Sequence, residues 1–297
     1  MSADERLLCI VGPTASGKSS LALRLAQDLG GEILSADSMQ IYRGFDIGTG
    51  KPTLAEQQLV PHHFVDVADP LEAWDAALWA EQAAQRIAEV RGRGRLPIVC
   101  GGTFLWVRAL VYGLADAPRG DEALRARHRE LAETEGRAAL HARLARVDPL
   151  SAARLAPNDF VRVSRALEVF ELTGKAMSQV QAEHGFREQR FATRLVGVKR
   201  EREEHDALIA KRVRGMLAEG LVSEVQGLVA RGFGEARVMQ SVGYRQTFEA
   251  LAAGTAADEA ALLDAIVRAT RVFARRQRTW LRAQPVEWLP ADATKLP

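Results

Sequence analysis

The sequence predicts an α/β protein, with a mostly parallel sheet flanked by helices and an inserted all-helical subdomain. Two observations support this fold class. Short apolar segments alternate with helix-like stretches over much of the chain, which is typical of a doubly wound parallel sheet. In the middle of the chain this alternation is interrupted by a series of helix-like segments, after which the strand pattern returns. The 297 residues suit two domains, or one large core with an insertion.

The first part of the chain supplies four expected strands. Residues 7–11 (LLCIV) are continuously apolar and stop at Gly12, as a buried parallel strand does. Leucines then recur every fourth position over 18–29, which predicts an amphipathic helix that ends at a pair of glycines. The other expected elements here are strands at 32–37, 62–67 and 96–102 and a helix over 75–91.

No strand pattern is found between about residues 114 and 193, where charged helical stretches such as 121–147 and 161–174 follow one another. We therefore expect a core made of 1–113 and 194–297, including the C-terminal helices, and a helical insertion over 114–193. The later core elements are expected to be a strand at 194–198, helices at 203–231 and 258–283, and an edge strand at 286–289.

Composition excludes several classes of protein. Hydrophobic residues make up 47% of the chain, enough for a buried core, so an intrinsically disordered protein is excluded. No apolar run approaches the roughly 20 residues of a membrane span, and no signal-peptide pattern is present. Cys9 and Cys100 both lie in apolar runs, which argues against a disulfide scaffold and a zinc site. We expect a reduced, cytoplasmic protein that is a monomer and does not bind membranes.

The most informative motif follows the first expected strand. Residues 12–19 (GPTASGKS) match GxxxxGK[ST] between a strand and a helix, the context that a phosphate-binding P-loop requires. Successive backbone N–H groups and the helix N-terminus bind phosphate oxygens, Lys18 adds a point charge, and the Ser19 hydroxyl is a candidate Mg²⁺ ligand. The residues of this expected site are Gly12, Pro13, Thr14, Ala15, Ser16, Gly17, Lys18 and Ser19. The motif predicts a P-loop NTPase-like core, but ATPases, GTPases and small-molecule kinases all use it.

A carboxylate follows the second expected strand. Asp37 would lie at the carboxyl end of a parallel strand beside the phosphate loop, where such folds place their chemistry. There it could act as a general base or hold Mg²⁺ indirectly. An N-cap or turn aspartate is the alternative.

Six segments, in order along nearly the whole chain, resemble the tRNA dimethylallyltransferase (tRNA isopentenyltransferase) family. They are GPTASGKS, ADSMQIYRGFDIGTGKP, VCGGT, PNDFVRVSRALEVFELTGK, SVGYRQ and ATRVFARRQRTWLR. No cysteine follows Cys100, so the resemblance is to the compact bacterial form, without the C-terminal zinc finger of eukaryotic relatives. The resemblance implies transfer of a dimethylallyl group from dimethylallyl diphosphate to N6 of the tRNA adenosine immediately 3′ of the anticodon (position 37), with release of diphosphate.

The resemblance also implies roles for individual residues. Asp37 is the expected base, Lys18 and Thr14 act at the leaving diphosphate, with Thr14 near its bridging oxygen, and Mg²⁺ is the expected cofactor with Ser19 as its ligand. Arg212 matches a family arginine directed at the diphosphate. Trp106 stands where the family commonly has tyrosine, and we expect it to pack in the core.

The same resemblance implies a tRNA-binding surface. The stretch 270–282 carries five arginines and no acidic residue, which favours a phosphate-binding helix, although a basic helix packed near an acidic neighbour is the alternative. The arginines of the insertion could equally form a solvated helix face. The full expected set is Asp37, Ser38, Met39, Gln40, Thr103, Arg125, Val161, Arg162, Val163, Ser164, Arg165, Gln240, Ser241, Val242, Gly243, Tyr244, Arg245, Arg275, Arg276, Gln277, Arg278 and Arg282.

Two other functions fit the phosphate loop. In an ATP-dependent small-molecule kinase, Asp37 would deprotonate a substrate hydroxyl. A nucleotide-switched RNA-binding module would bind ATP or GTP and needs a second strand-borne aspartate for Mg²⁺, for which Asp66 and Asp69 are weak candidates. The arginine-rich C-terminal helix and the helical insertion favour the tRNA prenyltransferase over the kinase.

Overall fold

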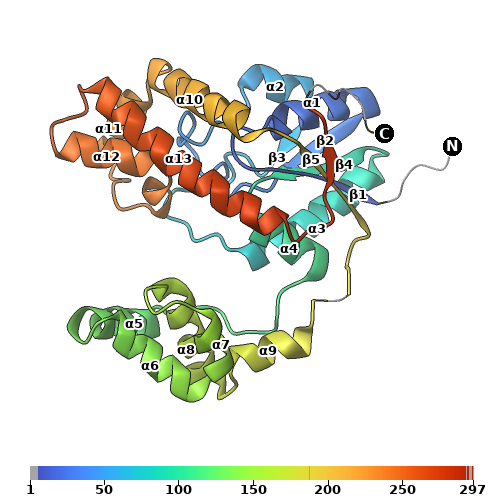
Figure 1. Cartoon of the computed structure of the whole chain (residues 1–297). Coiled ribbons are helices and arrows are strands. Elements are labelled where there is room, and N and C mark those ends of the chain that lie inside the picture. The colour runs from blue at the N-terminus through green and yellow to red at the C-terminus, as the bar shows by residue number, and fades with distance from the viewer. Residues whose placement is uncertain (1–5, 187, 292, 294–295, 297) are drawn as a thin grey trace. The chain divides into compact units, whose positions relative to one another are not determined.

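The computed structural model describes residues 6–186, 188–291, 293 and 296 (Figure 1). The chain forms two compact units. The core unit consists of Met1–Val111 and Arg190–Pro297, and the helical unit of Tyr112–Gln189, where the sequence analysis placed an insertion at 114–193.

The core unit is built on a parallel sheet of six strands in the order β3-β2-β4-β1-β5-β6, which confirms the expected sheet. The β3 strand is shorter than the expected 62–67, because Phe64 and Asp66 adopt positive φ values of 64° and 56° that end the extended conformation. The strands are β1 (Leu7–Val11), β2 (Gly31–Ser35), β3 (His62–His63), β4 (Leu96–Gly101), β5 (Thr193–Val198) and β6 (Glu287–Leu289).

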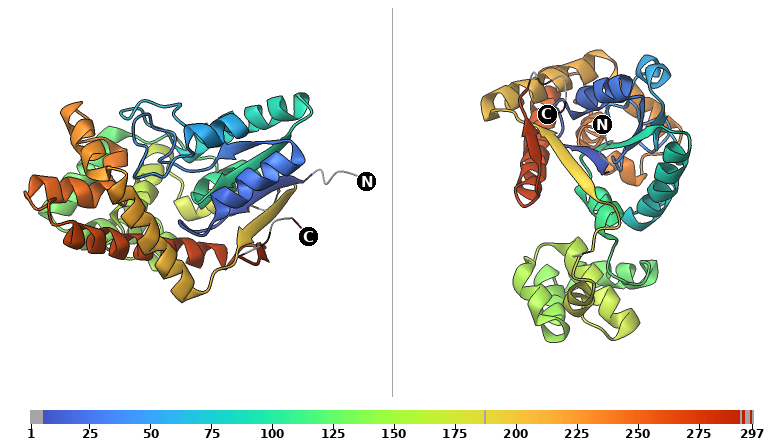
Figure 2. Two further views of the ribbon diagram at one scale, coloured as in Figure 1. Left: turned by 90° about the horizontal axis from the view of Figure 1, so that it is seen from above. Right: turned by 90° about the vertical axis from the view of Figure 1, so that its right-hand side faces the viewer.

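Helices cover both faces of this sheet (Figure 2). The chain crosses from β1 outward to β2 through α1 (Lys18–Leu29), and from β3 back to β4 through α3 (Ala76–Gly92). Because crossovers between parallel strands are right-handed, these opposite directions place α1 and α3 on opposite faces. The buried leucines of α1, Leu21 and Leu25, pack on Leu8, Ile10 and Ile98.

The C-terminal part of the core unit is helical. The single helix expected at 203–231 is two helices, because Gly220 adopts a φ of 100° between them. Long helices α10 and α13 pack side by side (Figure 1). The remaining helices of this unit are α2 (Leu54–Leu59), α4 (Phe104–Tyr112), α10 (Arg202–Ala218), α11 (Leu221–Ala230), the 3₁₀ helix Arg237–Gln240, α12 (Tyr244–Ala252) and α13 (Glu259–Leu281).

The helical unit has its own apolar core, which includes Leu140, Leu144, Val163 and Leu167. Glu168 is fully buried beside it. The helices of this unit are α5 (Glu122–Thr134), α6 (Arg137–Val147), α7 (Pro149–Arg154), α8 (Phe160–Thr173) and α9 (Met177–His184).

The two cysteines are free thiols buried in β1 and β4, as expected. Burial raises the pKa of Cys9 to about 12 and that of Cys100 to about 11, so both stay protonated. Within the described part of the chain, no helix combines the length and apolar character needed to cross a membrane.

Candidate active site

The phosphate loop lies between β1 and α1. Ala15 and Gly17 adopt φ values of 60° and 94°, and left-handed residues of this kind occur in loops whose backbone N–H groups bind anions. A Cβ atom on Gly12 would lie 2.6 Å from Ser16 Oγ, so any larger residue there would force the Ser16 side chain to move. The fold therefore places the GxxxxGK[ST] segment in a tight turn between a strand and a helix, which is the context that the motif requires.

A cavity of about 550 Å³ opens beside this loop within the core unit. Its walls come from the loop, the carboxyl ends of β2 and β4, the segment 48–52, and helices α10 and α13. Fourteen of the predicted site residues line it, and so the structure brings together the expected catalytic residues and part of the expected tRNA surface. They are Thr14, Lys18, Ser19, Asp37, Ser38, Met39, Gln40, Thr103, Arg212, Gln240, Ser241, Val242, Gly243 and Gln277.

Two cations face this cavity from different elements. Lys18 begins α1, and its Nζ donates to the backbone oxygen of Pro13 at 3.4 Å. Arg212 on α10 donates to the backbone oxygen of Thr49 at 3.2 Å. Burial lowers the pKa of both groups, the nearby Asp37 opposes that shift, and Arg212 lowers the pKa of Lys18 further. Asp37 and, for Arg212, Glu219 only partly offset this cost of burial, so two desolvated cations facing one cavity favour an anionic ligand.

Asp37 follows β2 and is partly exposed to the cavity. Its Oδ1 accepts a hydrogen bond of 2.9 Å from the N–H of Met39, so it also stabilises the turn, as the alternative interpretation expected. This bond fixes the carboxylate at the carboxyl end of β2. The turn role and a role in chemistry are therefore compatible.

The residues after Asp37 are held by internal hydrogen bonds. Thr103 Oγ1 accepts from the N–H of Ser38 at 3.1 Å. The side chain of Gln40 donates to the backbone oxygen of Gly50 at 2.9 Å and accepts from Ser35 Oγ at 3.0 Å. These bonds fix the wall on which Asp37 lies.

Sequence reasoning missed Glu224, which holds the segment 46–50 from α11. Its carboxylate accepts from the N–H groups of Asp46 at 3.1 Å and Ile47 at 2.8 Å, and from the hydroxyl of Tyr244. Gly48 packs against the Tyr244 ring, where a Cβ atom would lie 2.4 Å from the nearest ring carbon. The only local signal was the glycine-rich sequence of the segment itself, because its partners lie far away in the chain.

Several residues expected to contact tRNA have buried side chains, among them Val163, Ser164 and Tyr244. The side chains of Val163 and Ser164 are buried in the helical unit, where Ser164 Oγ lies 2.9 Å from His128 Nδ1. Tyr244 is completely buried, and burial together with Glu224 raises its pKa. These three side chains pack inside the protein and are not part of its exposed surface.

Two predicted arginines of the helical unit are engaged with Glu168. Arg125 Nε lies 3.0 Å from its Oε1, and Arg165 binds Oε2 while also donating to the backbone oxygen of Pro118 at 2.5 Å. Arg162 pairs with Asp159, and Val161 is exposed. Arg125 and Arg165 thus have a structural role in addition to any contact with RNA.

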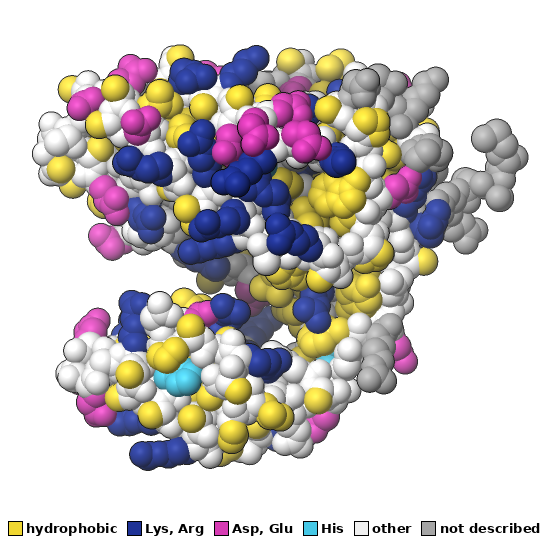
Figure 3. Space-filling model, in the orientation of Figure 1, with side chains coloured by type: hydrophobic (Ala, Val, Ile, Leu, Met, Phe, Trp, Pro, Cys, Tyr) yellow, Lys and Arg dark blue, Asp and Glu magenta, His cyan; other side chains and the backbone are white. Residues whose placement is uncertain are grey.

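The arginine-rich helix α13 has two kinds of residue. Arg275, Arg276 and Arg282 are exposed, and Lys and Arg side chains gather on the face of the core unit along which α13 runs (Figure 3). Gln277 is buried, and Arg278 NH1 lies 2.6 Å from His205 Nδ1. Of the other predicted contacts, Arg245 is exposed on α12.

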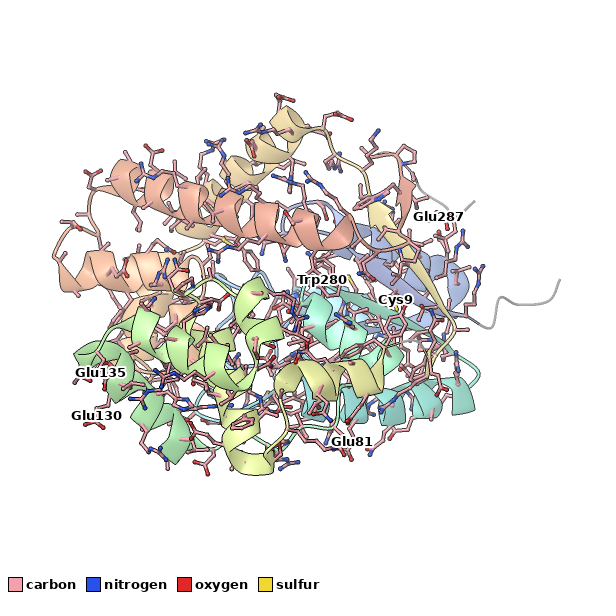
Figure 4. The ribbon with its side chains drawn as sticks, turned by 60° about the horizontal axis from the view of Figure 1, so that its bottom comes forward. Cys9, Glu81, Glu130, Glu135, Trp280 and Glu287 are labelled. Atoms are coloured by element: carbon pink, nitrogen blue, oxygen red, sulfur yellow. The ribbon has the colours of Figure 1, made fainter. Side chains whose placement is uncertain are left out.

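Aromatic packing fixes the end of α13 and the interior near β2. Trp280, near the C-terminal end of α13 (Figure 4), stacks on Phe104 with ring centroids 5.3 Å apart. Trp106 is buried and stacks on Trp79 at 5.2 Å, as expected for a core residue. Trp79 in turn donates to the backbone oxygen of Ser35 at 3.1 Å, which anchors the end of β2 just before Asp37.

Comparison with known proteins gives consistent results. The IPP transferase family model matches residues 40–284. A tRNA dimethylallyltransferase of Sorangium cellulosum is 62% identical over 283 residues, covering 95% of this chain and 90% of that protein. One from Geobacter sulfurreducens is 46% identical over 290 residues, covering 97% and 93%.

Solved structures also match nearly the whole chain. A tRNA isopentenylpyrophosphate transferase from Bacillus halodurans has a TM-score of 0.70 and 37% identity, covering 97% of this chain and 90% of its own. A eukaryotic dimethylallyltransferase acting on tRNA has a TM-score of 0.78 and 26% identity, covering 97% and 74%. The chain belongs to the IPP transferase family.

Proposed function

We propose that this protein is a tRNA dimethylallyltransferase. It transfers the dimethylallyl group from dimethylallyl diphosphate to N6 of the adenosine 3′-adjacent to the anticodon (position 37) and releases diphosphate. The observation that carries this proposal is that Asp37 lines the same cavity as the phosphate loop, Lys18 and Arg212. Family membership supports this activity over an ATP-dependent kinase and over a nucleotide-switched RNA-binding module.

The donor fits the two kinds of surface in the cavity. The diphosphate would bind the loop N–H groups, Lys18 and Arg212, with the Thr14 hydroxyl near the bridging oxygen. The five-carbon chain would lie against the apolar part of the wall, to which Val213, Met216, Ile266 and Phe273 contribute. As the C–O bond breaks, negative charge develops on the diphosphate, and donors already in place stabilise it.

The site also fits Mg²⁺. The Ser19 hydroxyl lines the cavity, and Mg²⁺ usually needs only one or two protein oxygens beside substrate phosphates and water. The described residues contain no cluster of three His, Cys, Asp or Glu side chains that would form a protein-only metal site. When bound, Mg²⁺ would supply positive charge beside the leaving diphosphate, with Ser19 as its protein ligand.

Asp37 would take the proton of the acceptor. The exocyclic N6 of adenine is a weak nucleophile because its lone pair is delocalised into the ring. As N6 bonds to C1 of the donor, the C1–O electron pair leaves with diphosphate and an N6 proton passes to the Asp37 carboxylate. General base catalysis of this kind contributes about 10²- to 10⁴-fold. The target base must leave its stack to enter the cavity.

The cavity is formed within one chain, and we propose that the enzyme acts as a monomer. We expect the exposed arginines of α13 to bind phosphates of the anticodon stem-loop, because planar guanidinium groups match phosphate geometry.

A transfer assay tests the proposed function. The protein is incubated with unmodified tRNA, Mg²⁺ and either labelled dimethylallyl diphosphate or labelled ATP, and the RNA is digested to nucleosides. Label from the diphosphate donor in prenylated adenosine, without consumption of ATP, is the expected result. Hydrolysis of ATP or movement of its phosphate, without prenyl transfer, would establish a kinase or nucleotide-switched protein instead.

A further inference from the structure

The backbone of Thr14, in the middle of the phosphate loop, is held from both sides by residues of distant helices. Its N–H donates to Oε1 of Gln277 on α13 at 2.9 Å. Its carbonyl oxygen lies 2.8 Å from Nε2 of His205 on α10. Both polar groups of the Thr14 backbone are therefore used before any ligand binds.

Gln277 connects the loop to the end of β4. Its Nε2 donates to the backbone oxygen of Gly102 at 3.0 Å, and the side chain is buried. The approach is so close that a Cβ atom on Gly102 would lie 2.6 Å from this nitrogen. A side chain between the Thr14 N–H and the Gly102 carbonyl must offer an acceptor to the first and a donor to the second. A neutral amide provides both on one short side chain.

His205 makes the second connection. Arg278 has only donors, and its NH1 lies 2.6 Å from His205 Nδ1, so Nδ1 is the acceptor. Nε2 therefore carries the proton and donates it to the Thr14 oxygen. Burial and the Arg278 charge lower the pKa of His205, which agrees with this neutral form.

We propose that Gln277 and His205 are positioning residues that hold the phosphate loop through Thr14, and that Gln277 acts on donor binding rather than on tRNA. This inference rests on the proposed function, because it assigns a diphosphate to the loop. It changes the role that the sequence resemblance implied for Gln277. Two consecutive residues of α13 would thus serve different substrates, with the exposed Arg276 directed to RNA and the buried Gln277 to the loop.

The first test separates the two substrates. Binding of inorganic pyrophosphate with Mg²⁺ is measured by calorimetry, and tRNA affinity by filter binding, for Gln277→Met and for Arg276→Gln. We expect Gln277→Met to weaken pyrophosphate binding roughly 10-fold, since it leaves a buried N–H without its acceptor, and to change tRNA affinity less than twofold. Arg276→Gln should instead weaken tRNA binding and leave pyrophosphate binding nearly unchanged. In turnover, Gln277→Met should raise KM for the donor and leave KM for tRNA unchanged.

The second test uses Gln277→Glu and distinguishes positioning from packing. The ionised carboxylate can accept from the Thr14 N–H but repels the Gly102 oxygen, whereas the protonated acid can make both bonds. The ratio of its pyrophosphate affinity to that of the wild type should therefore rise towards 1 as the pH falls from about 8 to about 5. Taking the ratio at each pH removes the protonation of pyrophosphate itself, which is the same for both proteins.

The outcomes are decisive in either direction. Unchanged pyrophosphate binding with weakened tRNA binding in Gln277→Met would overturn the inference, as would a Gln277→Glu ratio that does not depend on pH. If thermal melting shows that Gln277→Met is unfolded, the pH dependence of the Gln277→Glu affinity ratio tests the inference by itself. Failure of the wild-type protein to bind pyrophosphate would instead overturn the proposed donor site itself.

Discussion

In the core unit, the partly buried Arg212 lies near Lys18 and faces an open cavity, whereas in the helical unit Arg125 and Arg165 both bind the buried carboxylate of Glu168. Burial lowers the pKa of the two core cations. For Glu168, burial alone would raise the pKa, but hydrogen bonds from Arg165, the Asp121 N–H and Arg125 lower it below the ordinary value.

The direction of these shifts separates a ligand site from a scaffold. A buried charge whose partners are all inside the protein is stabilised in its ionised form, and its removal affects stability. A buried cation whose charge is not balanced by the protein is destabilised in its ionised form until an anion binds. Arginine occurs in both settings, so residue type alone does not distinguish a ligand site from a scaffold. What distinguishes them is whether the opposite charge comes from the protein or from a ligand.

The largest expected effect concerns Asp37. Asp37→Asn should lower kcat by about 10²- to 10⁴-fold, because the amide cannot accept the N6 proton but can still accept a hydrogen bond from the Met39 N–H. The affinity for tRNA and the free energy of unfolding should change little. Single-turnover kinetics, filter binding and urea unfolding measure these quantities.

Asp28→Asn is the matched control, since Asp28 is exposed near the end of α1. It should leave kcat unchanged. Loss of tRNA binding in Asp37→Asn with an unchanged rate of the chemical step would contradict its role as the base.

The second prediction concerns Arg212, the partly buried cation of α10. Arg212→Gln should weaken binding of dimethylallyl diphosphate by roughly 10- to 100-fold, since it removes a charge-assisted hydrogen bond to the diphosphate. Lys211→Gln, one residue earlier and exposed, is the control, and it should bind the donor normally. If calorimetry gives the two variants equal affinities for dimethylallyl diphosphate, Arg212 does not contribute to donor binding.

The helical unit should respond in the opposite manner. Glu168→Gln should lower the free energy of unfolding by about 1–3 kcal/mol at neutral pH, because the Asp121 N–H and two arginines lose a charged acceptor. The kcat for bound tRNA should be nearly unchanged. Glu130→Gln, at an exposed position on α5 (Figure 4), is the control.

The stability should also depend on pH with a definite sign. The Glu168 carboxyl titrates near 4.5 in the unfolded chain and at a lower pH in the folded protein. Its contribution is therefore complete above 4.5 and disappears as the pH falls through the folded-state pKa. Urea unfolding should show a shallower loss of stability below pH 4.5 in Glu168→Gln than in the wild type. Parallel pH profiles would show that Glu168 is not preferentially ionised in the folded state.

The parts of this structure that follow from short-range sequence patterns could be predicted. The loop at 12–19, the helix α1 after it and the buried strands depend on neighbouring residues, and the structure agrees with them. The division of 203–231 into two helices also had a local signal, Gly220, that was not used. The end of β3 depends on the positive φ of Phe64 and Asp66, for which neither residue type gives a clear signal.

The site was less predictable because a motif locates a segment of chain but not the direction of its side chains. Ser164 and Tyr244 lie in matching segments and yet point into the protein. Gln277 and Glu224 act on loops 263 and 176 residues away, respectively. No periodicity or spacing in the sequence connects residues at such separations, and the fold alone brings them together.

The smallest expected effect concerns the exposed arginines of α13, which are the counterpart of the paired arginines of the helical unit. Among the residues that the structure describes, no ion pair is formed by Arg275 or Arg276, whereas Arg271 on the same helix lies 3.7 Å from Asp206. Free guanidinium groups that neutralise RNA phosphates release counterions, and each phosphate contact adds about 0.7–0.9 to the slope of log K against log salt concentration.

The double change Arg275→Gln and Arg276→Gln should therefore reduce this slope by about 1.4–1.8 in filter-binding titrations of tRNA. Arg271→Gln should reduce it by less, because the Arg271 charge is already partly neutralised by Asp206. If the double variant keeps the wild-type slope, α13 is not part of the RNA interface. If Arg271→Gln has the larger effect, a protein ion pair does not exclude a phosphate contact. The distinction between paired and unpaired arginines would then fail on this helix, and the ion pairs of Arg125 and Arg165 would be no argument against their binding RNA.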